Sequence, residues 1–464
     1  MYTSRGPGKP FQAFSSAPFV ANTSPKQGLA QIMRMTLLFR WVLVGWLISI
    51  CMWSLCSGDE ASLVRETADS LGTISIPYGF YNDSFGFAVG YVHSVTGYPQ
   101  KQAGLLGTAM VGTQGSAMAI LYGQDILLPN TERFLFDPIA SVGYFSDNES
   151  YIDGNPNFSG ERAGSNGSDK DNFVTGDGWD NYFRLRFQYL LPIAGGKVVS
   201  FDTVALKEGL PVLKPREEPR WNPLSSGKIY LELTPFYRSQ QVDGDDIESN
   251  LKTNGLDVGV FWDNRDFHQN PSCGNALNLQ LSRDFGWLNS TESWTTVSAE
   301  YDHYIPLFLS PAFRQSVLAL DAWTAYSPSW NEIENGVIEN RPPAFSGATL
   351  GGEWRMRGYP SNRFSDKTAV YYAAELRMIP YWNPFEGWPW LQHYVGVAWV
   401  QFVPFVEVGR VGPSWDLSEL HSDMKVDVGL GFRVWAKGIV ARVDVAVSEE
   451  SVGVQMMVSQ PFQF

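Results

Sequence analysis

Strict alternation between apolar and polar residues recurs near the carboxyl end of the chain. In residues 425–436 the positions between the apolar ones carry Lys425, Asp427, Gly429, Gly431, Arg433 and Trp435. Residues 397–409 and 439–448 repeat this pattern, again with charged side chains on the second face. Successive side chains of a strand point to opposite faces, so this period predicts β-strands with one apolar face.

The residues on the second face separate two kinds of β-protein. A soluble sandwich also alternates, but its polar face usually mixes Thr and Ser with Lys and Glu that face water. Here glycines and opposite charges share that face, which favours a transmembrane barrel with lipid outside and water inside. A closed barrel also pairs every backbone group without leaving an edge. The soluble sandwich stays open as the alternative.

Further alternating segments extend this prediction over residues 75–464, without a long amphipathic helical repeat or a separate soluble domain. They lie at 85–93, 118–126, 133–144, 182–191, 228–237, 255–266, 275–281, 294–304 and 316–326. The fold class predicted is therefore all-β, an antiparallel transmembrane β-barrel. Short turns alternate with long loops, as expected when the two ends of a barrel face different compartments.

The amino-terminal part has the layout of a secretory signal peptide. An apolar run at 41–55 follows Arg34 and Arg40 and precedes small residues and charges, which predicts a signal peptide at 33–57. Residues 1–32 are an unpatterned extension, untranslated if synthesis begins at Met33 or Met35, and residues 58–74 form a short periplasmic segment. A single anchoring helix is the alternative to cleavage, and lipidation of the cysteine at position 56 is a minor one.

Several function classes find little support. A net charge of −14 without a basic stripe argues against a nucleic-acid partner. Beyond the leader only Cys273 remains, which excludes an intramolecular disulfide and a cysteine-based metal site. Neither Gly-x-Ser-x-Gly nor His-Glu-x-x-His occurs, and the adjacent Asp302 and His303 face opposite ways on a strand. The acidic loop at 144–180 offers oxygen ligands for calcium, but without a complete ligand spacing we expect a solvated loop, no metal and no cofactor.

The long connection at residues 327–366 stands out as a candidate functional loop. It far exceeds a usual hairpin connection, and its second half is rich in glycine and aromatic residues, which suits packing. Arg357 within it needs an anion if it is buried. Glu407 and Asp427 lie on faces predicted to point inward. We therefore expect the loop to fold into the barrel lumen.

At these residues the chain resembles the BamA/TamA outer-membrane assembly superfamily, also called bacterial surface antigens. Arg357, Gly358 and Tyr359 stand in the family's Val-Arg-Gly-Phe/Tyr motif, and residues 405–409 match its Phe-x-Asp/Glu-x-Gly strand. The segments "GLDVGVFWDNRDFHQNPSCG", "DVGLGFRVW", "ARVDVAVS" and "IPYGFYNDSFGFAVGYV" resemble further family strands. The resemblance implies a barrel of about 16 strands, with Arg357 pinning the lumen loop to Glu407, near Asp427 and Arg433.

The end of the chain resembles the targeting signal of bacterial outer-membrane barrels. Apolar residues alternate from position 452 and end on Phe462 and Phe464, with Gln460 interrupting the series. All the apolar residues of this segment, the two phenylalanines included, are predicted to share one face.

The resemblance implies an integral outer-membrane protein, not an enzyme, that assists insertion or translocation of protein or lipid. Its partners would be outer-membrane lipid, client outer-membrane proteins or lipids, and a periplasmic accessory protein. Family members that assemble proteins carry periplasmic POTRA domains before the barrel, whereas here only residues 58–74 separate leader and barrel, which predicts a member lacking them. A structural surface protein or passive pore is the alternative, favoured if residues 85–93 and 452–464 pair fully as first and last strands.

Overall fold

The computed structural model describes residues 72–82, 84–199, 206–212, 222–244, 247–332 and 338–462. The N-terminal extension (1–32), the signal peptide (33–57), most of the periplasmic segment (58–74) and Phe464 lie outside the described residues. These assignments therefore stay predictions.

Strands make up most of the described chain. The first half contains β1 (Gly72–Asn82), β2 (Gly86–Thr96), β3 (Gly104–Gly112), β4 (Ala117–Gln124), β5 (Ile126–Leu127), β6 (Phe134–Ser150), β7 (Val174–Leu190), β8 (Leu206–Lys207), β9 (Leu210–Pro211), β10 (Lys228–Asp243) and the 3-10 turns η1 (Pro156–Phe158) and η2 (Ala194–Lys197). The second half contains β11 (Glu248–Asp263), β12 (Gly274–Asp284), β13 (Trp294–Pro306), β14 (Phe313–Tyr326), β15 (Asn331–Glu332), β16 (Ile338–Glu339), β17 (Ala348–Leu350), β18 (Phe364–Asp366), β19 (Thr368–Pro380), α2 (Pro389–Tyr394), β20 (Val397–Gly412), α3 (Leu417–Leu420), β21 (Lys425–Ala436), β22 (Ile439–Ser448) and β23 (Val452–Val458).

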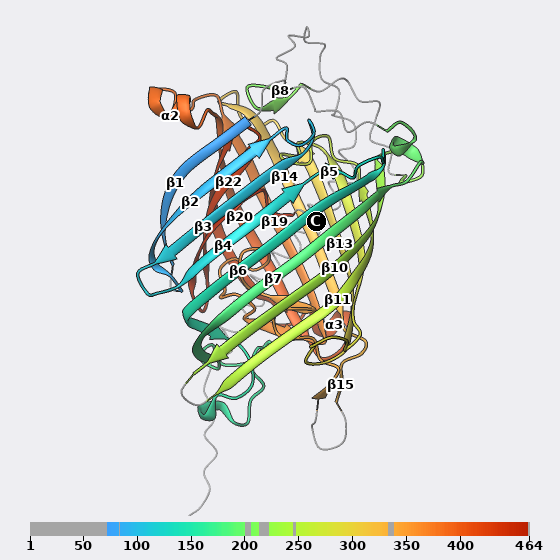
Figure 1. The fold of residues 1–464 in the computed structure, drawn as a ribbon, viewed down its shortest axis with the longest axis vertical. Coiled ribbons are helices and arrows are strands. Elements are labelled where there is room, and N and C mark those ends of the chain that lie inside the picture. Colours follow the sequence, from blue (N-terminus) through green and yellow to red (C-terminus); the bar gives the residue numbers. More distant parts are fainter. Residues whose placement is uncertain are drawn as a thin grey trace, which may run out of the picture. The chain divides into compact units, whose positions relative to one another are not determined.

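One antiparallel sheet forms the wall of the fold. It has 17 strands in the described chain, each beside its neighbour in sequence, and the connections within β7–β10 and β14–β19 carry short separate pairs. The two-residue β5 continues β4, since both pair with β6; counting them as one leaves 16 wall strands. Figure 1 shows these long strands running side by side at a tilt. The predicted antiparallel barrel of about 16 strands is confirmed.

The two ends of the sheet curl round toward each other. At one end of the barrel, the Lys437 ammonium, in the turn between β21 and β22, donates to the Thr73 carbonyl of β1 over 3.0 Å. The Thr96 hydroxyl of β2 donates to the Lys437 carbonyl, also over 3.0 Å. These contacts join residues about 340 to 360 positions apart in sequence, and they place the first strands beside the last ones.

The alternation read from the sequence corresponds to the two faces of the wall. In β21, Val428 and Leu430 are 52% and 57% exposed, whereas Asp427 and Arg433 are 1% and 0% exposed. A sheet that exposes its aliphatic residues and buries its charges suits lipid outside and a polar interior. Among the described residues, no helix combines the length and the apolar character that a bilayer crossing requires.

Two details of the predicted strands need correction. The first wall strand is β1, which begins at Gly72, rather than the segment at 85–93, which lies within and just before β2. At the other end β23 stops at Val458, and Phe462 does not share its exposed face: the chain turns at Ser459, where φ is 106°, and Phe462 is buried. Gln460, which interrupts the apolar series, is buried at that turn.

Candidate functional site: a charged lumen loop beside the barrel seam

The connection between β14 and β19 spans residues 327–367. Its second half, residues 341–366, folds against the inner face of the wall, and we call this part the lumen loop. Its two halves pair through β17 and β18. Leu350, Met356, Tyr359 and Phe364 are buried in one apolar cluster with wall residues such as Tyr371. Burial of this apolar surface holds the loop in place, and it puts Arg357 in the interior.

Arg357 contacts carboxylates from three different wall strands. Its Nη2 lies 2.9 Å from Glu375 Oε1 on β19, its Nε 3.2 Å from Glu407 Oε2 on β20, and its Nη1 2.6 Å from Asp444 Oδ2 on β22. The backbone N–H of Arg357 also donates to Glu407 Oε2 over 2.7 Å. The guanidinium lies 3.6 Å from the centroid of the Phe405 ring, so its face is covered as well as its edges.

The wall supplies its own arginines to the same network. Arg377 and Arg433 each approach Glu375, at 2.8 and 2.7 Å, and Arg442 lies 3.0 Å from Asp444. We call the full set the charge cluster; it comprises Arg357, Arg377, Arg433, Arg442, Glu375, Glu407, Asp427 and Asp444, all at most 2% exposed. Four arginines therefore pair with the three carboxylates Glu375, Glu407 and Asp444, and such pairing is how buried charge is tolerated in a medium of low dielectric constant.

Gly358 brings the loop backbone against the wall. Its N–H donates to Asp427 Oδ2 over 3.0 Å, and a Cβ at this position would lie 2.7 Å from Asp427 Cβ. Only glycine permits this approach without displacing the strand. Next along the loop, the Tyr359 hydroxyl donates to the Val426 carbonyl over 3.3 Å.

The lumen loop also touches the last strand and the turn before it. The Ser451 hydroxyl donates to the Gly358 carbonyl over 2.8 Å, and Gln455 Nε2 lies 3.5 Å from the Arg357 carbonyl. Further along the loop, Arg363 makes a two-point ion pair with Glu450, at 2.6 and 3.0 Å. The loop is thus held to both sides of the β22–β23 turn.

The first and last strands define the seam of the barrel. In the described residues β1 pairs with β2 along its whole length, and β23 pairs with β22, but no backbone ladder joins β1 to β23. With 7 residues, β23 is also shorter than its 10-residue neighbour β22. Among the strands that the structure describes, none therefore pairs with the outer edge of β1 or with that of β23.

Some of the predicted site residues contact one another directly in the structure, and others are connected only through a further residue. Arg357, Gly358, Glu407 and Asp427 meet directly. Arg433 bonds to Glu375 and Gln460 and reaches Arg357 only through Glu375. Phe462, predicted as part of a targeting signal, lies with its ring centroid 5.4 Å from the Arg377 guanidinium.

Sequence reasoning did not name Glu375 and Asp444 as partners of Arg357. Both stand on the charged faces of alternating segments, so their inward direction was readable. The sequence did not indicate how close they lie to the loop, because the stagger between strands decides which inward-facing residues lie at the same height along the barrel axis.

Comparison with known proteins identified one family model and several solved structures. Residues 224–448 match the model described as the Omp85 superfamily domain, while the search of curated proteins gave no match. Among solved structures, BamA from Haemophilus ducreyi lacking POTRA domains 1-3 is 12% identical with a TM-score of 0.42, covering 84% of this chain and 70% of that one. CdiB from Escherichia coli is 13% identical (TM-score 0.49; coverage 87% and 65%), and CdiB from Acinetobacter baumannii 12% identical (TM-score 0.46; 83% and 59%). The chain thus spans less than two thirds of the length of either CdiB structure.

Proposed function

We propose that this chain, a member of the Omp85 superfamily and an integral outer-membrane β-barrel protein, assists the insertion or translocation of protein or lipid through the β1–β23 seam. Its partners are then outer-membrane lipid and client outer-membrane proteins or lipids. A periplasmic accessory protein is a further candidate partner.

The seam is the single observation that carries this proposal. Every described wall strand from β2 to β22 has a neighbour on both sides, whereas β1 and β23 have one each. In hydrocarbon an unpaired backbone N–H or C=O costs several kcal/mol, about the value of a lost hydrogen bond in an apolar medium. An incoming strand satisfies these groups, so the seam favours an extended client segment over a folded one.

The lumen loop supports the same function by controlling the position of β23. Gly358 and Arg357 contact the β22–β23 turn and β23 itself, while Arg357 is fixed to β19, β20 and β22. The loop is held by β19, β20 and β22 and it also touches β23. Its position therefore sets how far β23 stands from β1.

A passive pore is less well supported. The lumen loop places its apolar cluster and the charge cluster inside the wall at β19–β22, and all of these side chains are buried. A diffusion pore requires water-filled space along the axis. Packed side chains on this side of the interior leave less of the cross-section for water.

Covalent closure of the seam tests the proposal. In a Cys273→Ser background, cysteine pairs are placed along β1 and β23, as a panel because no ladder fixes their register. The purified barrel in vesicles is then given a chemically unfolded outer-membrane barrel or a fluorescent phospholipid. We expect the oxidised seam to abolish accelerated client folding or lipid transfer, and a reductant to restore it.

A matched control joins two strands that already pair. Val445 and Val454 lie opposite each other on β22 and β23, so Val445→Cys with Val454→Cys adds a disulfide without closing the seam. This variant should keep its activity when oxidised. Equal activity of a seam-locked and a reduced barrel would refute the role of the seam.

A further inference from the structure

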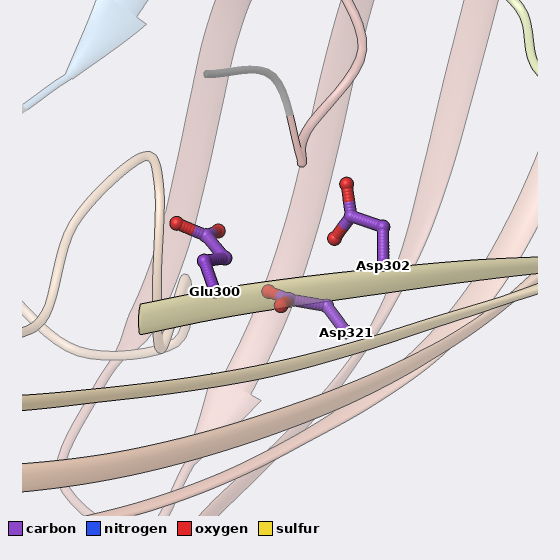
Figure 2. A group of neighbouring side chains, drawn as sticks. All are labelled: Glu300, Asp302 and Asp321. Atoms are coloured by element: carbon purple, nitrogen blue, oxygen red, sulfur yellow. The ribbon is translucent and has the colours of Figure 1, made fainter. Parts of the chain in front are cut away.

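Three carboxylates form an acidic cluster on the inner wall, beside the charge cluster but separate from it. Glu300 and Asp302 stand two residues apart on β13 and so share a face, and Asp321 on β14 lies directly opposite Asp302. One carboxylate oxygen of each residue lies within 4.8 Å of those of the other two. Figure 2 shows the three carboxyl groups gathered on one side of their strands.

The charge of this acidic cluster is incompletely balanced. Arg355 Nη2 lies 2.5 Å from Glu300 Oε2, and this is the cluster's one ion pair among the described residues. Two further arginines are engaged elsewhere, since Arg265 pairs with Asp263 and Arg377 with Glu375, each at 2.8 Å. When all three carboxyl groups are ionised, the one directly bonded arginine leaves a formal charge of −2.

Asp321 adds an independent indication of a missing partner. Its side chain is 4% exposed, yet within the described chain neither of its carboxylate oxygens has a hydrogen-bond partner. Asp302 is fully buried and its Oδ1 also has none, while its Oδ2 accepts from the Tyr304 hydroxyl over 3.2 Å. Buried polar atoms are satisfied in the great majority of native structures, so these three oxygens indicate a missing partner.

We propose that Glu300, Asp302 and Asp321 bind a divalent cation, and that calcium is the ion that fits. Calcium takes several carboxylate oxygens directly, at 2.3–2.6 Å, in an adaptable geometry. Magnesium demands strict octahedral geometry at about 2.0–2.1 Å and usually keeps several waters beside only one or two carboxylates, so three carboxylates favour calcium. Two positive charges match the formal charge of the cluster.

The surroundings allow the ion to enter and complete its shell. Glu300 keeps 14% of its side chain exposed, whereas Asp302 and Asp321 are buried. Solvent therefore reaches the acidic cluster beside Glu300. Water supplies the remaining ligands from that side. Since Glu300 also binds Arg355 of the lumen loop, the ion lies beside an attachment of the loop to the wall, two residues before Arg357.

Calcium titration of the full-length protein tests this site independently of any assembly activity. The protein is stripped with chelator, exchanged into a synthetic detergent free of lipopolysaccharide, and titrated calorimetrically with calcium chloride and, separately, magnesium chloride. We expect one saturable calcium site, at least tenfold weaker magnesium binding, and a calcium-dependent rise in the unfolding temperature. The absence of saturable calcium binding to the wild-type protein at millimolar concentration overturns the proposal.

Two substitutions identify the ligands. Asp321→Asn and Glu300→Gln should each weaken calcium binding at least tenfold. In chelator, Asp321→Asn should unfold at a higher temperature than the wild type because a repulsive charge is gone, and calcium should reverse that order. Asp137→Asn is the matched control: Asp137 is a buried wall carboxylate paired with Arg186 at 2.6 Å, and its loss should leave calcium binding unchanged. Wild-type calcium affinity in both ligand variants would assign the ion elsewhere and overturn the proposal.

Discussion

The carbonyl oxygen of Arg357 lies so close to Gly453 that a Cβ on that glycine would come within 2.1 Å of it. The lumen loop and the last strand are therefore in direct contact beside the arginine that ties the loop to the wall. The two backbones have no room to come closer, and a movement of either one away from the other breaks this packing.

Substitution of Gly453 by Ala should push the lumen loop and β23 apart. The added methyl group meets a backbone oxygen, which cannot rotate away as a side chain can. Overpacking of this kind costs about 1–3 kcal/mol. We expect a lower unfolding temperature in detergent and a changed cross-linking yield at the seam.

Gly104→Ala is the control for Gly453. Gly104 also lies in a wall strand, but the atom nearest to a Cβ added there would be 3.9 Å away. This variant should unfold like the wild type. If both glycine variants behave alike, contact between Arg357 and Gly453 does not position β23.

Replacement of Arg357 by Met should destabilise the barrel by about 3–5 kcal/mol, because it leaves the buried Glu407 without its cation. Arg357→Lys should recover only part of this loss, since an ammonium cannot bridge Glu375, Glu407 and Asp444 as the guanidinium fork does. Equilibrium unfolding in urea, followed by tryptophan fluorescence, measures both. The double variant Arg357→Met with Asp444→Asn should cost less than the sum of the two single changes.

An ion pair whose carboxylate is exposed provides the contrast to Arg357. Lys425 lies 2.6 Å from Glu449, whose side chain is 62% exposed. Lys425→Ala should cost at most about 1 kcal/mol. Equal losses for Arg357→Met and Lys425→Ala would show that the charge cluster adds nothing beyond a surface pair.

Removal of the Glu450 carboxylate should loosen the second attachment of the lumen loop. Arg363 is fully buried and pairs with Glu450 at two points, so Glu450→Ala leaves a buried guanidinium with only Ser168 as a described hydrogen-bond partner. Hydrogen bonds to charged groups contribute about 1.5–3 kcal/mol. We expect faster proteolytic cleavage of the loop in intact barrels, whereas Glu449→Ala at the neighbouring exposed position should not change the rate.

A charge introduced on the outer face of the barrel wall should lower the folding yield far more than a charge introduced in a connection outside the wall strands. Leu430 is 57% exposed on β21 and Leu417 58% exposed on α3. Leu430→Arg places a cation against lipid, at a cost of about 2–4 kcal/mol near the bilayer midplane. Folding yield in phospholipid vesicles should fall for Leu430→Arg and stay near wild type for Leu417→Arg; the reverse order would place β21 away from lipid.

The sequence by itself determined which way the wall residues point. A strand has a side-chain period of two, so the alternation at residues 425–436 already separated Val428 and Leu430 from Asp427 and Arg433. The length of the connection before β19 and the arginine within it indicated a loop that folds inward. Local pattern was sufficient here because each inference depends on neighbours along the chain.

Only the tertiary structure decided which inward residues meet. Glu375, Glu407 and Asp444 contact Arg357 because the stagger of β19 to β22 brings them to one level, and Glu300, Asp302 and Asp321 gather because of the register of β13 against β14. The inward turn of Phe462 depends on the backbone at Ser459, which alternation does not encode. Strand stagger and backbone turns are set by the closure of the whole wall, so a sequence pattern fixes the face of a residue but not its partners.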